Sequence, residues 1–80
     1  MTETWWTIRR QPALDHGTDT FLTGDYSPTW EVFPKLPTRF ESERSAETHA
    51  AGMVLLDHAL FGFLSVVKIR CNKKDWYVWM

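Results

Sequence analysis

The sequence predicts a small α+β domain, in which a mostly antiparallel sheet of three to five strands carries one main helix on a face. Segments rich in β-branched and aromatic residues occur both before and after residues 41–60, and such segments are typical of strands. The run with helical spacing of its apolar residues lies between them. Because eighty residues suit one domain and not two, we expect residues 1–80 to form a single compact domain with the order β-β-β-α-β.

Three segments before the helix are expected to form strands: residues 4–10, 18–23 and 29–33. In the first of them, alternation places Trp6 and Ile8 on one face of the sheet. Turn residues separate the segments, and a hairpin is the simplest connection between the second and the third. Pro34 and Pro37 then stop regular structure and predict an extended connector.

The helix is expected to begin just after Phe40, because Ser42 is a favourable N-cap residue. Its inward face is predicted from apolar residues that recur at helical spacing, namely Ala46, Ala50, Met53 and Val54. Two ends are open. The helix stops near Gly52 or continues to about Leu60, since glycine costs only about 1 kcal/mol relative to alanine in a helix interior.

Residues 63–70 are the clearest strand of the chain, and their apolar residues on both faces predict a position inside the sheet. Residues 71–75 are typical of a turn. Residues 76–79 are either a fifth strand or an aromatic tail, and the sequence leaves open whether Trp76 to Met80 belongs to the core or to an interface.

Composition excludes several classes of function. The formal net charge of −1 argues against a dedicated nucleic-acid binder and against a polyanionic DNA mimic. Cys71 is the only cysteine, so an internal disulfide is impossible, as suits a reducing cytoplasm. The start of the chain lacks the features of a signal peptide, and residues 50–67 are too interrupted to span a bilayer. We therefore expect a cytoplasmic protein.

Motifs for catalysis or for metal binding are absent from the sequence. The metal-ligand spacings CxxC, HxxxH and HExxH do not occur, and the four glycines are too scattered to form a phosphate loop. We expect no enzyme activity, no metal, no cofactor and no small-molecule substrate.

Protein binding is the class that remains. A small sheet has edge strands that can pair with a partner, and tryptophan and tyrosine are favoured interface residues. Local acidity would suit a basic partner surface. The predicted contact residues are the acids of the first half of the chain and of the helix start: Asp15, Asp19, Asp25, Glu31, Glu43 and Glu47.

Most of the chain, from Trp5 to Arg70, resembles a type of small phage or prophage protein. Phe40-Glu41-Ser42-Glu43-Arg44-Ser45-Ala46-Glu47, followed by a strand ending Val66-Val67-Lys68-Ile69-Arg70, carries the resemblance. Some proteins of this type are anti-CRISPR proteins. The resemblance implies a non-enzymatic inhibitor in a bacterial host, which binds a subunit of a type I CRISPR–Cas effector and hinders target DNA binding. The acidic residues would then face the basic groove that holds nucleic acid.

Two alternatives remain open from the sequence. The first is a small nucleic-acid-binding or regulatory module, because aromatic residues interleave with lysine and arginine residues near the C-terminal end. The residues of this module would be Lys68, Arg70, Lys73, Lys74 and Trp76. The second is a homodimeric assembly protein joined through an edge strand or the aromatic tail.

Overall fold

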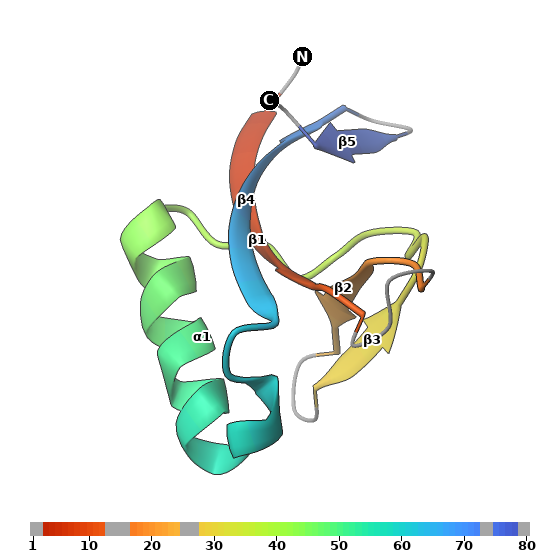
Figure 1. The fold of residues 1–80 in the computed structure, drawn as a ribbon. Coiled ribbons are helices and arrows are strands. Elements are labelled where there is room, and N and C mark those ends of the chain that lie inside the picture. The colour runs from red at the N-terminus through yellow and green to blue at the C-terminus, as the bar shows by residue number, and fades with distance from the viewer. Residues whose placement is uncertain (1–2, 13–16, 25–27, 73–74, 79–80) are drawn as a thin grey trace.

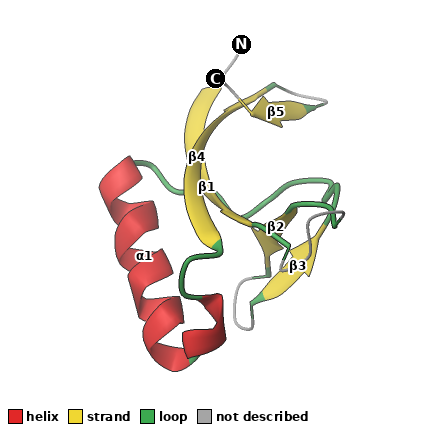
Figure 2. Cartoon of the chain, viewed as in Figure 1, coloured by secondary structure: helices red, strands yellow, loops and turns green. Residues whose placement is uncertain are grey.

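The computed structural model describes residues 3–12, 17–24, 28–72 and 75–78, and they form an α+β fold as predicted (Figure 2). The elements in chain order are β1 (Glu3–Arg10), β2 (Thr20–Thr23), β3 (Thr29–Glu31), α1 (Glu43–Leu56), the short 3-10 helix η1 (His58–Leu60), β4 (Leu64–Cys71) and β5 (Trp76–Val78).

The five strands form one antiparallel sheet in the order β3-β2-β1-β4-β5. β1 pairs with β4 along its whole length, from Glu3 opposite Cys71 to Arg10 opposite Leu64. In contrast, only the end of β1 pairs with β2. The long pair curls, and α1 lies against its convex side while β2, β3 and β5 lie on the other side (Figure 1). β4 therefore lies inside the sheet, as its apolar faces predict.

The ends of several elements differ from the predictions. α1 ends at Leu56, which lies between the two predicted ends, because the Asp57 N–H closes the last turn on the Met53 carbonyl. The Asp57 carboxylate then accepts a hydrogen bond from the Ala59 N–H and starts η1. Gly62 follows with φ of 83°, a conformation that other residues rarely adopt.

Two strand boundaries also need correction. β3 stops at Glu31 and not at residue 33. Cys71 belongs to β4 and not to the turn that follows, because its side chain is buried and the hydrogen-bonded pairing with β5 continues through it. Of the two alternatives left open for residues 76–79, the structure shows a strand, β5. Its neighbours Trp79 and Met80 lie outside the described residues.

The convex side of the sheet holds a continuous apolar core. Ile8, Leu22, Met53 and Leu60 form its buried centre, and both Ala46 and Met53 of the predicted inward helix face are buried. α1 begins where the sequence indicates, since the Ser42 hydroxyl accepts a hydrogen bond from the Ser45 N–H at 3.1 Å. The apolar spacing of α1 thus positions the helix on β1 and β4.

The concave side is closed by contacts between distant segments. The rings of Phe21 and Trp76 meet edge to face, with centroids 4.9 Å apart. The Trp76 indole N–H donates to the Pro34 carbonyl at 2.9 Å, and the buried Thr7 hydroxyl donates to the Thr38 carbonyl at 2.6 Å. The proline-containing connector therefore forms a wall of the domain.

Candidate functional site

The predicted acidic contact residues fall into two separate groups. Asp19 precedes β2, where its carboxylate lies 3.6 Å from Nε of Arg9, and Glu31 is exposed at the end of β3. Glu43 and Glu47 are exposed on α1, which lies on the other side of the β1–β4 pair (Figure 1). These four acids do not form one patch. The other two, Asp15 and Asp25, lie outside the described residues.

The predicted basic and aromatic set is also divided by the sheet. Lys68 and Arg70 share the face of β4 on which Leu64 packs against the core, because residues two apart in a strand share a face. Trp76 pairs with Cys71 and therefore projects from the opposite, concave face. Lys73 and Lys74 lie outside the described residues.

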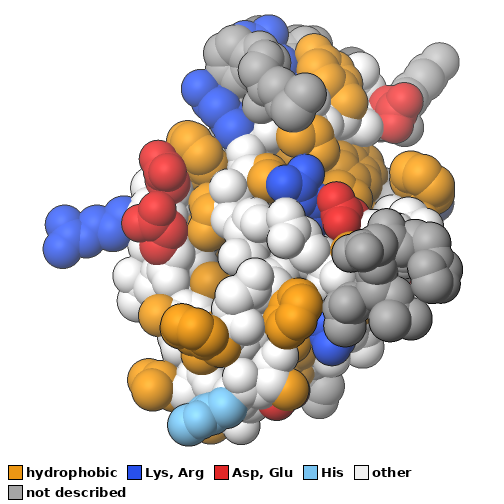
Figure 3. Space-filling model, in the orientation of Figure 1, with side chains coloured by type: hydrophobic (Ala, Val, Ile, Leu, Met, Phe, Trp, Pro, Cys, Tyr) orange, Lys and Arg blue, Asp and Glu red, His pale blue; other side chains and the backbone are white. Residues whose placement is uncertain are grey.

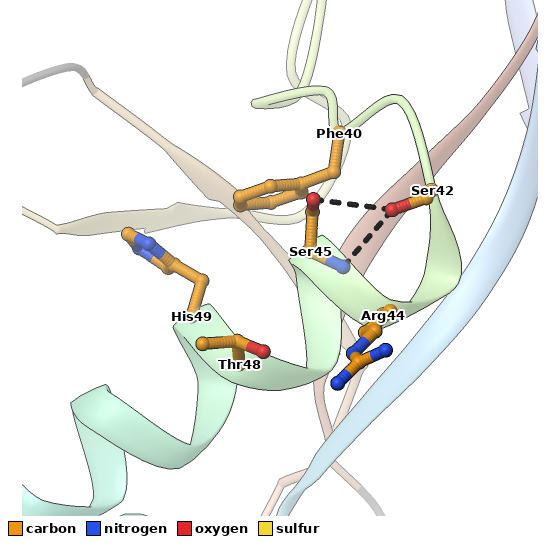
Figure 4. A pocket seen from close by; sticks show the side chains of 6 residues that line it. All are labelled: Phe40, Ser42, Arg44, Ser45, Thr48 and His49. Carbon is orange, nitrogen blue, oxygen red and sulfur yellow. Dashed lines mark hydrogen bonds between the residues drawn. The ribbon is translucent and has the colours of Figure 1, made fainter.

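A hollow of about 500 Å³ lies beside the start of α1, lined by Phe40, Ser42, Arg44, Ser45, Thr48 and His49 (Figure 4). The Ser42 and Ser45 hydroxyls are hydrogen-bonded to each other, and Ser42 also caps the helix. The His49 ring stands 5.1 Å from the Phe40 ring, while Arg44 points away from it (Figure 4). The two serine hydroxyls of this hollow thus serve the helix start.

Metal-ligating side chains are dispersed. Within the described ranges, no three His, Cys, Asp or Glu residues gather into a group that could hold a metal ion. Neither helix in those ranges has the length and apolar character needed to cross a membrane.

Three strongly exposed apolar side chains gather where α1 passes into η1. Leu55, Leu56 and Phe61 are 76%, 92% and 76% exposed, and apolar side chains are prominent on this part of the surface in Figure 3. We name these three residues the α1–η1 end. The neighbouring Met53 and Leu60 take the inward positions.

A second apolar feature adjoins the edge strand β5. The Phe33 side chain is 87% exposed beside a hollow of about 480 Å³ that Phe21, Trp76 and Val78 also line. Lys35 and Asp75 stand at this hollow. The Asp75 carboxylate accepts a hydrogen bond from the backbone N–H of Trp76. This backbone donor of β5 is therefore already hydrogen-bonded.

The α1–η1 end was not among the residues predicted to bind a partner, although the sequence holds a signal for it. Adjacent residues of a helix point about 100° apart, so Leu55 and Leu56 cannot both follow Met53 into the core. Leu55, two residues after Met53, points to the outer side of the helix, whereas Leu56, three residues after Met53, is 92% exposed at the last position of α1.

Comparisons with known proteins supply no relative: no protein-family model matches the chain, no curated protein matches its sequence and no solved structure matches its fold.

Proposed function

We propose that this chain is a non-enzymatic protein-binding module that inserts the α1–η1 end into an apolar cleft of a partner protein. The observation that carries this proposal is the exposure of three large apolar side chains, each at least 76%, within a few residues of one another. Exposed apolar side chains that gather in this way mark interaction sites, whereas single ones are ordinary.

Energetics support the choice of this surface. Removing a leucine or phenylalanine side chain from water contributes about 1.5–3 kcal/mol, and in the free chain that contribution is absent for Leu55, Leu56 and Phe61. A partner that covers them gains it on binding. The segment that carries the three side chains lies at one end of the molecule (Figure 1), so a concave apolar site is the complementary shape.

The resemblance of residues 5–70 to small phage proteins supplies the class of partner. We propose a cytoplasmic subunit of a type I CRISPR–Cas effector, whose binding of target DNA the bound domain would hinder. Glu43 and Glu47, exposed on the same helix, would add attraction to a basic groove in that subunit. This specific partner is a prediction that depends on the resemblance.

The test is a pull-down from nuclease-treated bacterial lysate that contains type I effectors. The effector subunit that is recovered is then purified, and its affinity for this chain is measured. Leu56→Ser and Phe61→Ser are each expected to weaken binding at least tenfold, as the truncation of a central interface residue does. Phe33→Ser is the matched control, because it removes an equally exposed apolar side chain elsewhere and should leave the affinity unchanged.

Each half of the proposal can fail separately. If Phe33→Ser abolishes binding and Leu56→Ser does not, the α1–η1 end is not the interface. If wild-type mass in solution rises with concentration and Leu56→Ser abolishes the rise, a second copy is the partner and the domain is an assembly protein. Recovery of a protein unrelated to CRISPR effectors, lost on Leu56→Ser, would retain the surface and reject the partner class.

A further inference from the structure

Aromatic and cationic side chains alternate across three strands on the face of the sheet where α1 packs. Trp6 of β1 pairs with Lys68 of β4, and Arg70 lies between Thr4 of β1 and Tyr77 of β5. Paired residues share a face, and so do residues two apart along a strand. Trp6, Lys68, Arg70 and Tyr77 therefore emerge side by side, and we name these four residues the β1–β4–β5 strip.

The β1–β4–β5 strip begins where α1 no longer covers the sheet. Leu64, at the start of β4, packs against the apolar core, and Lys68 and Arg70 follow toward the other end of the strand. In Figure 1 that end of β1 and β4 extends beyond the N-terminal end of α1. The Tyr77 side chain is 50% exposed there.

The register also places both strand acids on one face, together with Arg9, and only cations on the other. Among the described strand residues, the charged ones on the face of the strip are all cations, namely Arg10, Lys68 and Arg70. The strand acids, Glu3 and Glu31, lie on the opposite face. Although the net charge of the whole chain is near zero, this face of the sheet is thus locally cationic.

We propose that the β1–β4–β5 strip binds single-stranded nucleic acid, with Tyr77 as a stacking platform for a base and with Lys68 and Arg70 as phosphate contacts. Bases stack on exposed aromatic rings, and cations beside the rings follow the backbone. The Lys68 ammonium lies 5.7 Å from the centre of the Trp6 ring, which keeps charge and aromatic surface adjacent. A duplex hides the base faces that such a strip would use.

The expected affinity is modest and sensitive to salt. Each phosphate that a cation neutralises adds about −0.7 to the slope of log affinity against log salt concentration for single strands, so two cations give a shallow slope of about −1.4. Fluorescence anisotropy with labelled oligothymidylate and oligouridylate at low salt, with a duplex of matched length beside them, measures both quantities on the full chain.

Substitutions assign the binding to the strip. Tyr77→Leu should reduce the affinity roughly tenfold by removal of the stacking ring, whereas Tyr77→Phe should retain it. Arg70→Gln should lower the magnitude of the salt slope by about 0.7. Lys35→Gln removes an exposed cation from the connector and should change neither quantity. Glu43→Gln with Glu47→Gln, on the helix of the same side, should tighten binding.

Several results would overturn the inference. The absence of binding at low salt, equal affinity for the duplex, or equal losses with Lys35→Gln and Arg70→Gln would each reject a single-strand site. Binding of polyglutamate as tight as that of the oligonucleotides would identify an acidic protein as the ligand instead. Circular dichroism of each variant separates lost contacts from lost folding, and Leu56→Ser should leave oligonucleotide binding intact.

Discussion

The two faces of the sheet are held by different kinds of contact. On the convex face, interchangeable apolar side chains of β1, β2, α1 and η1 fill a continuous core. On the concave face, the closure depends on individual polar and aromatic contacts, among them the bond from Trp76 to Pro34 and the bond from Thr7 to Thr38. Apolar packing depends on volume, whereas a hydrogen bond depends on one donor and one acceptor in place. The faces should therefore respond differently to mutation.

The largest expected effect tests the convex face. Ile8 is fully buried in the apolar core, and Ile8→Ala should lower the free energy of unfolding by about 2–5 kcal/mol through lost burial and a cavity. Urea denaturation measures it, with the 92% exposed Leu56 changed to alanine as the control. A loss below about 1 kcal/mol for Ile8→Ala would mean that this core is loosely packed.

An intermediate effect tests the concave face. Trp76→Phe retains a ring against Phe21 but removes the indole N–H that binds the Pro34 carbonyl, and we expect a loss of about 1–3 kcal/mol for the unsatisfied acceptor. Trp5→Phe is matched to it, because the Trp5 indole donates to the exposed Glu3 carboxylate. Equal losses for both variants in urea denaturation would contradict the assigned role of Trp76.

The smallest expected effect lies at the start of α1. Ser42→Ala should cost about 1 kcal/mol, since it removes the acceptor for the Ser45 N–H. Ser45→Ala keeps that N–H bonded and should cost less, which thermal unfolding of the two variants side by side can resolve. A larger loss for Ser45→Ala would show that its hydroxyl, and not the cap, stabilises this turn.

Local patterns were sufficient to predict the convex half of the fold. The spacing from Ala46 to Val54 predicted the inward face of α1, and the Ser42 cap predicted its start. The end at Leu56 could not be predicted, because it depends on Asp57 closing one helix and opening another, a choice that a propensity scale does not contain.

The candidate surfaces were less accessible to sequence reasoning, for a physical reason. Which side chains meet across strands depends on register, and no local pattern placed Tyr77 opposite Arg70 or turned Trp76 toward Phe21. Grouping Trp76 with Lys68 followed closeness in the chain, whereas the pleat sends them to opposite faces. The acids likewise share charge and exposure without sharing a surface.

The pairing of β1 with β4 also sets when this protein can fold during its synthesis. β1 leaves the ribosome before β4, yet the strand that pairs with its whole length ends only at Cys71. Until that residue has emerged, one side of β1 lacks its β4 partner, and α1 can pack against β1 alone and not against the β1–β4 pair. A nascent chain arrested before β4 should therefore remain sensitive to protease, and folding should occur in one late step and not strand by strand.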